Sequence, residues 1–439
     1  MNRPIPHRPT LLVALLTACA TSACLAQAPL SLDAAIALAQ ERSRQLVAQG
    51  AAAQAAREMA LAAGQRPDPT LKAGLNNLPV TGADRFSTTT DFMTMRSFGV
   101  MQEFTREDKR RARSARFERE AESADAARAL ALVNLRRDAA MAWLDRHFVE
   151  RQHALLRTQR DEALLQIDAA EAAYRGARGM QADVFAARAA VAQIDDRLRQ
   201  LDLQRATSIT RLARWIGAAA EQPLADAPDL SSTRVAHDAD LVATLAHHPE
   251  LDLMARQEAV AQAEADVARS NKRSDWSVEL MYSLRGSAYS NMVSINVAVP
   301  LQWDQANRQD REVGAKTALV EQMRAQREEA TREHLAQTRT WLQQWRNGRE
   351  RLSHYDATLL PLAGERTRAA LAAYRGGGGP LTAVLDARRN EIEQRSERLR
   401  IEMETAALWA QLEYLIPAAH ERLPRTASTA ATTTTEATR

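Results

Sequence analysis

The stretch Ala-Ala-Tyr-Arg-Gly at residues 172–176 decides the fold, because the same five residues return at residues 372–376. In each place a short turn follows and then a helical pattern, which ends with Trp-Ile-Gly at 215–217 in one copy and with Leu-Ile-Pro at 415–417 in the other. Self-similarity over so long a period is the mark of a duplicated structural unit. The chain is therefore predicted to contain two copies of one unit.

The duplication divides the chain into a first repeat at residues 27–217 and a second at 241–417, joined by a linker at 218–240. Each repeat has the pattern of a helix, two strands and a long helical hairpin, and Ser31 is the predicted N-cap of a first helix that runs to about residue 64. Residues 418–439 are rich in Thr and Ala and hold too few large apolar side chains to bury a core, so we expect a disordered tail.

Residues 1–26 have the pattern of a secretory signal peptide. Arg3 and Arg8 precede a short apolar stretch followed by small residues, which is the order found in cleaved leaders. The apolar stretch is too short to span a bilayer as a helix. Both cysteines lie in this leader, so cleavage before Gln27 would leave no thiol for disulfides or metal sites. The alternative is lipidation at Cys19, because Leu-Thr-Ala-Cys resembles a lipobox.

Each repeat holds two segments in which the side chains alternate in polarity. They lie at residues 70–80 and 92–104 in the first repeat and at 276–284 and 293–299 in the second. Alternation with a period of two places apolar side chains on one face of a strand and polar or small ones on the other. Separated by turns, such segments are the weak signature of membrane barrel strands.

Four strands per chain have a consequence for assembly. Bacterial membrane barrels begin at about eight strands, and each unpaired backbone group at a strand edge in lipid costs several kcal/mol. The barrel must therefore be shared between chains. Two chains would give the minimum barrel and three would give twelve strands, and the strand count leaves both open.

Long helical segments follow each strand pair, at residues 106–174 and 308–374. At 1.5 Å per residue, roughly seventy residues form a rod on the order of 100 Å long, far beyond a globular helix. The returning helices carry apolar seams with near-heptad spacing. These seams consist of Val184, Ala187, Val191, Ile194, Leu198 and Leu201 in the first repeat, and of Leu385, Ile392 and Leu399 in the second. The predicted fold is therefore mainly α with a small β part.

Composition and motifs exclude several classes of function. The 58 Lys and Arg residues nearly balance the 55 Asp and Glu residues, and they alternate along helical segments, which favours a solvated surface laced with salt bridges. A nucleic-acid interface would need a basic stripe with interleaved aromatic residues, and none is present in the sequence. No nucleophile triad, phosphate-binding glycine loop or HExxH motif occurs either. We expect no enzyme activity, no cofactor and no resident metal.

The leader, the opening Ser-Leu-Asp-Ala-Ala-Ile-Ala-Leu-Ala at residues 31–39, the two-fold repeat and the turns that contain Tyr and Gly resemble the TolC-type outer-membrane factors. The resemblance covers roughly residues 29–417. It implies a homotrimer with a twelve-stranded barrel in outer-membrane lipid and a helical tunnel across the periplasm. It also implies a periplasmic adaptor and an inner-membrane pump as partners. The alternatives are a periplasmic adaptor and a coiled-coil scaffold of an envelope complex.

Four short stretches resemble the heavy-metal efflux subgroup of that family. They are Pro-Thr-Leu at 69–71, Asn-Asn-Leu-Pro at 76–79, Phe-Met-Thr-Met at 92–95 and Lys-Arg-Arg at 109–111. One departure weakens this assignment, because Thr-Arg-Glu-Asp at 105–108 replaces the glycine pair that the family has at the strand-to-helix turn.

The resemblance places a constriction at the turns of the hairpins, where acidic residues form rings that narrow the pore. Asp386 matches one of the two acidic positions, while Ala383 occupies the other. The first repeat has the reverse pattern, with Asp183 and Ala186. Three symmetry copies of one carboxylate in a narrow lumen would attract cations. Alternatively, both aspartates only stabilise the first turn of a helix through its dipole.

Tyr174 and Tyr374 end the outgoing helices, and they either form an interhelical lock, as the family implies, or simply pack. Gly176 and the run Gly376, Gly377, Gly378 and Gly379 follow them and would allow a tip that opens, although turn chemistry alone also explains glycines. Three methionines have a metal alternative. Thioethers suit Cu(I), but Met93, Met95 and Met101 at strand spacing more often form one face of a hairpin. The pair at residues 247–248, His-His, is expected to be solvated.

Overall fold

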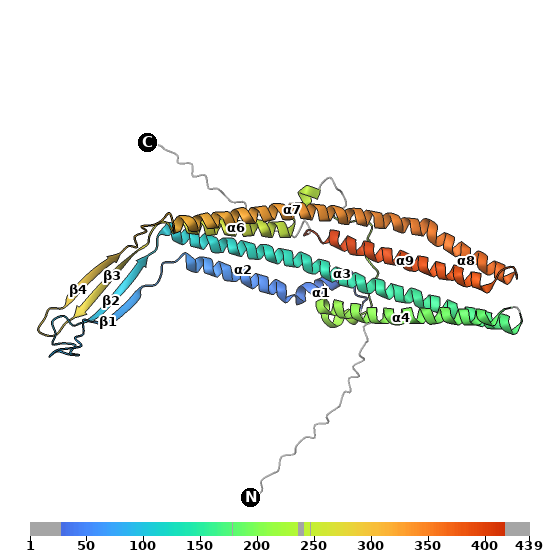
Figure 1. The fold of residues 1–439 in the computed structure, drawn as a ribbon, viewed down its shortest axis with the longest axis horizontal. Coiled ribbons are helices and arrows are strands. Elements are labelled where there is room, and N and C mark those ends of the chain that lie inside the picture. Colours follow the sequence, from blue (N-terminus) through green and yellow to red (C-terminus); the bar gives the residue numbers. More distant parts are fainter. Residues whose placement is uncertain (1–27, 178, 236–240, 246, 418–439) are drawn as a thin grey trace, which may run out of the picture.

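The computed structural model describes residues 28–177, 179–235, 241–245 and 247–417. The molecule is a long rod with a four-stranded sheet at one end and the turns of two helical hairpins at the other (Figure 1). The predicted class, mainly α with a small β part, is confirmed. The expected leader with Cys19 and the expected tail at 418–439 lie outside the described residues.

Two helices, and not one, open the first repeat. Helix α1 spans Leu32–Arg42 and α2 spans Arg44–Ala63. Ser31 is the predicted N-cap, and its hydroxyl accepts the Ala34 backbone N–H at 3.2 Å. Ser43 interrupts the helix because it takes an extended conformation and caps α2 in the same way. The prediction of one continuous helix was therefore wrong at this serine.

The four strands form a single antiparallel sheet in the order β1-β2-β3-β4. They span Thr70–Asn76, Met95–Phe104, Trp276–Leu284 and Met292–Ala298. The central pair β2–β3 joins the two repeats. Strand β1 ends earlier than predicted because Asn77 has a φ of 57°, which turns the chain out of the extended conformation.

Helix α3, Glu107–Arg175, is continuous over 69 residues, as predicted. Its counterpart was predicted to be uninterrupted and is not. Helix α7, Gln309–His354, passes through a π-helical turn at Tyr355–Leu359 into α8, Leu360–Arg375. Pro361 near the start of α8 lacks a backbone N–H and its ring crowds the preceding turn, which accounts for the widened segment.

The returning helices are α4, Gln181–Ile216, and α9, Leu381–Glu413. The predicted seam of α4 is buried except for Leu198, which is half-buried. The seam of α9 lies differently: Leu385 and Ile392 are only half-buried, and the buried side chains are those of Leu381, Val384, Ala387, Glu391 and Leu399. Because Glu391 occupies the place that Val191 has in α4, the second seam buries a carboxylate. Arg388 and Arg395 pair with it at 3.1 and 2.6 Å.

The main hydrophobic core lies at the middle of the rod, where both repeats meet (Figure 1). It combines side chains of α1, α3, α7 and the ends of α4 and α9 with the short helix α5, Leu241–Leu245, and the 3-10 turn Gly217–Glu221. Trp143 is fully buried there, and its indole N–H donates to the Leu30 carbonyl at 3.1 Å. Trp409 donates to the Ser232 carbonyl at 2.7 Å. The two indoles thus fix the segment before α1 and the linker between the repeats to the core.

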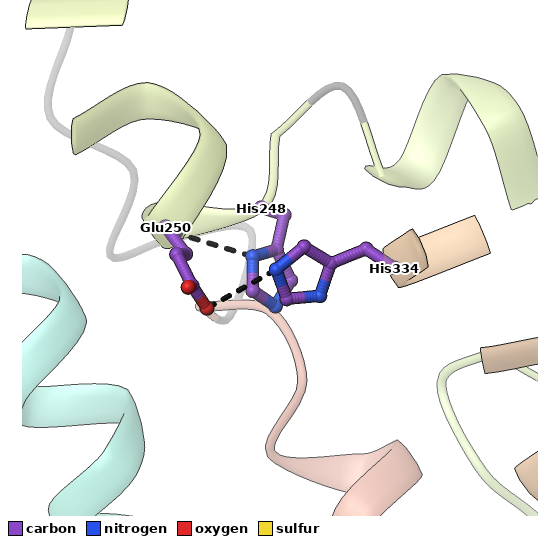
Figure 2. A group of neighbouring side chains, drawn as sticks. All are labelled: His248, Glu250 and His334. Carbon is purple, nitrogen blue, oxygen red and sulfur yellow. Dashed lines mark hydrogen bonds and ion pairs between the residues drawn. The ribbon is translucent and has the colours of Figure 1, made fainter. Parts of the chain in front are cut away.

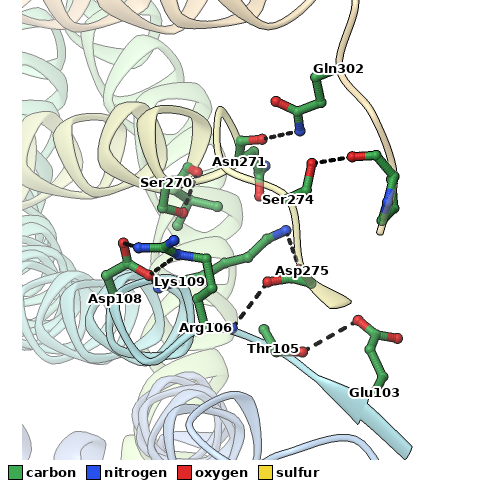
Figure 3. A network of polar contacts seen from close by, with 12 residues as sticks. Glu103, Thr105, Arg106, Asp108, Lys109, Ser270, Asn271, Ser274, Asp275 and Gln302 are labelled. Atoms are coloured by element: carbon green, nitrogen blue, oxygen red, sulfur yellow. Dashed lines mark hydrogen bonds and ion pairs between the residues drawn. The ribbon is translucent and has the colours of Figure 1, made fainter. Parts of the chain in front are cut away.

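Asp275 connects the sheet to the helices just before β3 (Figure 3). It accepts the backbone N–H of Arg106 at 3.0 Å and the Lys109 ammonium at 2.7 Å. Burial raises the pKa of Asp275, but these bonds outweigh it and hold the pKa below its ordinary value. The stabilisation is therefore present above the ordinary pKa of an aspartate and is lost as the pH falls through the lowered one.

Candidate channel-forming surfaces and hairpin tip

One face of the sheet is apolar and exposed across all four strands. Leu71, Val100, Leu280 and Ile295 are paired in register and form a row from edge to edge. They are 78%, 48%, 52% and 69% exposed, so nothing in the described chain covers them. A neighbouring row contains Ala73, Phe98, Tyr282 and Val293. A contiguous apolar face of this kind marks a contact with lipid or with another protein.

The opposite face of the sheet carries mostly polar or small side chains, together with methionines of β2, β3 and β4. The row that begins at Lys72 continues through Gly99 and Met281 to Ser294. The Lys72 ammonium bonds the Glu279 carboxylate of β3 at 3.0 Å. The alternation predicted from the sequence is therefore present, and it separates an apolar face from a polar one as in a barrel that encloses water.

Both outer strands have an open edge. In the part of the chain that the structure describes, β1 pairs only with β2 and β4 pairs only with β3. Every residue of β4 is exposed. The free edges carry unpaired backbone groups, which are a template for pairing with another strand.

The hairpin tips use similar turns with one difference. Gly176 and Gly376 each donate a backbone N–H to the carbonyl four residues earlier, at 3.0 Å. The next residue has a positive φ in both turns, 52° at Ala177 and 75° at Gly377. Only Gly377 among the five glycines of the predicted tip needs its conformational freedom. Gly379 packs closely on Ala373, and Gly378 bonds the Ala373 carbonyl at 2.9 Å.

The two candidate aspartates have different environments. Asp183 is half-buried, and its carboxylate accepts the Met180 backbone N–H at 3.0 Å. It therefore caps the first turn of α4. Asp386 is exposed on α9 and lines a cavity of about 170 Å³ together with Glu162, Arg388 and Arg389. Of the two, Asp386 is the more exposed.

The two tyrosines also differ. Tyr374 is half-buried against an apolar cluster that joins the hairpins, formed by Ala170, Val184, Ala187, Leu381 and Val384. Tyr174 is 49% exposed. The structure therefore brings Tyr374 and Asp386 to the side on which the two hairpins meet and leaves Tyr174 at the surface.

The methionines do not form a shared metal site. Met95 and Met101 lie on the same face of β2 but six residues apart, which is roughly 20 Å in an extended strand. Met93 precedes that strand. One ion cannot bind all three thioethers. Met95 and Met101 are strand residues, as predicted, whereas the prediction was wrong for Met93, which lies outside the strand.

The prediction that the pair of histidines is solvated was wrong for His248. It is 6% exposed at the N-cap of α6, Pro249–Ser270, where its ring accepts the Glu250 backbone N–H at 3.3 Å. His334 of α7 lies against it, with ring centroids 4.4 Å apart, and bonds the Glu250 carboxylate at 3.1 Å (Figure 2). The pKa of His248 is lowered to about 4, mainly by burial and further by the charges of His334 and Arg137. Sequence reasoning missed this group because no spacing along the chain connects the two histidines.

Among the described helices, none has both the length and the hydropathy that a bilayer crossing requires. Neither protein-family models nor curated proteins match the sequence. Solved structures do match. The outer-membrane channel OprN superposes with a TM-score of 0.74 at 16% identity, over 88% of this chain and 89% of that one.

VceC, an outer membrane protein of Vibrio cholerae, gives a TM-score of 0.73 at 17% identity, over 88% of this chain and 95% of its own. CusC, whose structures concern transmembrane channel formation, gives 0.74 at 14% identity, over 88% and 92%. All three share the arrangement of sheet and paired hairpins over nearly their whole length. The chain therefore has the protomer fold of outer-membrane channels, as its resemblance to the TolC-type outer-membrane factors implied.

Proposed function

We propose that the chain is the channel subunit of a tripartite efflux system and provides a passive, gated exit duct across the periplasm and outer membrane. The observation that carries the proposal is the sheet with one exposed apolar face and two open edges. In lipid, an apolar face gains by burial, whereas an open strand edge is costly. Copies of the chain satisfy both requirements by pairing β4 of one protomer with β1 of the next.

Three copies are the proposed number, as in the family that the sequence resembles. They would supply twelve strands, within the range of bacterial barrels. Below the barrel, the 69 residues of α3 extend roughly 100 Å. Three pairs of such hairpins would form the wall of a tunnel. The duct would take its energy from an inner-membrane pump, connected through a periplasmic adaptor at the hairpin tips, and would catalyse no reaction itself.

Engineered cysteines test the shared barrel, because the only native cysteines lie in the expected leader. Thr70 and the residues Ser294, Asn296 and Ala298 lie on the polar face of the two edge strands. Thr70→Cys is combined in turn with cysteine at each of the three β4 positions, and the protein is oxidised in native membranes. We expect at least one pair to give a covalent ring of three chains in denaturing gels.

Single-cysteine variants serve as controls, since each can form dimers at most. Monomers alone from all three pairs, in protein that fractionates with the outer membrane, would contradict the shared barrel. A water-soluble monomer obtained without detergent would contradict the channel itself and favour the coiled-coil scaffold. The periplasmic adaptor fits less well, because it needs one hairpin and lipoyl-like β segments whereas two hairpins are present here.

The gate is proposed at Asp386 and Tyr374, with Asp183 and Tyr174 as secondary candidates. Replacing both residues, Asp386→Asn with Tyr374→Ala, removes one charge per protomer and loosens the contact between hairpins at the tip. We expect higher single-channel conductance in planar bilayers and weaker selectivity for cations. Asp196→Asn is the matched control, because Asp196 is also exposed on a returning helix, and among the described residues its carboxylate accepts a hydrogen bond from Gln200. Unchanged conductance in the double variant would place the gate elsewhere.

The proposed substrates are heavy-metal cations, on the strength of the four stretches that resemble that subgroup. A strain without the gene should grow more poorly than its parent on copper, zinc or cobalt salts. Equal growth on all three, with loss of resistance to organic compounds, would contradict this substrate class and leave the duct itself in place.

A further inference from the structure

A ladder of ion pairs connects α6 to α7. Glu264 of α6 bonds Lys316 at 2.7 Å, and Glu258 bonds Arg327 at 2.9 Å and Arg324 at 3.3 Å. In both places α6 supplies the carboxylate and α7 supplies a permanent cation.

The pattern changes at the start of α6. Glu250 again supplies the carboxylate, but His334 replaces the lysine or arginine at 3.1 Å. A second imidazole, that of His248, lies beside the His334 ring (Figure 2). An ion pair between Glu250 and His334 does not require this second ring. Two imidazoles and a carboxylate are the ligands that Zn²⁺ and related ions prefer in proteins.

From this cluster we infer a binding site for a borderline divalent ion of the Zn²⁺ class, formed by His248, Glu250 and His334. The ligand atoms of the three residues already lie within 4.8 Å of one another, so small side-chain rotations bring them to one ion. His248 is 6% exposed and held in place by its position at the N-cap, whereas the Glu250 side chain is 46% exposed and leaves a path for the ion. A fourth position would be left to water or another solute.

Two groups nearby oppose or adjust the binding. The His248 ring accepts the Glu250 backbone N–H at Nδ1. An ion that binds Nδ1 displaces this N–H, and an ion that binds Nε2 requires the ring proton to move to Nδ1, so the bond is lost in either case. Arg137 of α3 adds positive charge near His248, but Asp138 pairs with it at 2.9 Å and offsets much of that charge. The exposed carboxylate of Glu250 supplies the negative charge that favours a cation.

The site is independent of the proposed duct, and its test uses the full chain purified in detergent without a polyhistidine tag. After treatment with a chelator, Zn²⁺ is titrated in competition with a chelating dye, and Co²⁺ absorption reports the ligands. We expect one ion per protomer and a higher Tm with Zn²⁺, because an ion that binds only the folded chain stabilises it. His334→Gln and Glu250→Gln should each weaken binding by about tenfold or more, the loss that even a supporting partner of a ligand causes.

His153→Gln is the matched control. His153 bonds Asp202 at 3.1 Å with a similar exposure to His334, but no second imidazole is described beside it. Its loss should leave Zn²⁺ affinity unchanged. No saturable binding in the parent protein, or equal affinity in parent, His334→Gln and Glu250→Gln, would overturn the site. Channel activity does not enter this test, so its failure says nothing about the duct.

Discussion

Replacing Trp143 by Ala should lower the free energy of unfolding by about 3–5 kcal/mol, the usual loss for a large aromatic side chain cut to alanine in a packed core. The indole is fully buried where both repeats meet, and its N–H satisfies the Leu30 carbonyl. The substitution would leave a large cavity and a carbonyl without its partner. Urea unfolding of the detergent-solubilised protein measures the effect as a lower midpoint.

Phe185→Ala is the control for this substitution. Phe185 is also aromatic and helical but 58% exposed near the tip, so its removal should change the midpoint little. Equal losses in the two variants would mean that the middle of the rod is not the core that holds the repeats together.

Replacing Ile295 by Arg should prevent insertion of the channel. Ile295 lies on the apolar face of β4 and is 69% exposed. An arginine that faces lipid near the bilayer midplane costs about 2–4 kcal/mol in a barrel, and each of three protomers would carry one. We expect loss of the detergent-resistant oligomer and of outer-membrane protein in fractionation.

The adjacent position gives a matched control, because Asn296 lies on the opposite, polar face of the same exposed strand. Asn296→Arg adds the same side chain where water would meet it, and it should insert and assemble. If Asn296→Arg failed while Ile295→Arg assembled, the assignment of the two faces would be reversed.

The sequence predicts the fold well because its signals are periodic. The alternation along β3 and the unbroken helical pattern of α3 each repeat within a short window of sequence. Such a pattern can be read from neighbouring residues alone, without knowing the rest of the fold. The boundaries that failed depend on single residues. The side chain of Ser43 caps the next helix by accepting a backbone N–H, which replaces the hydrogen bond that a continuous helix would make. Pro361 widens one turn but does not end the helix. The sequence pattern around both residues therefore stays helical.

The functional residues were less predictable because they meet only in three dimensions. Asp183 and Asp386 occupy corresponding turns, yet one caps a helix and the other lines a cavity. His248 and His334 come from different helices, and their contact follows from how α6 packs against α7. Neighbouring polar residues on one helix could have suggested Glu250 and His248, but nothing in the sequence pairs them with His334.

The π-helical turn at Tyr355–Leu359 makes the two legs of the rod mechanically unequal. Helix α3 has an unbroken series of backbone hydrogen bonds along its length. In the rod formed by α7 and α8, the hydrogen-bonding pattern changes at the π-helical turn. Bending therefore needs less force in the second repeat. If the tip widens, the hairpin that carries Tyr374 and Asp386 would move while the hairpin of the first repeat stays in place.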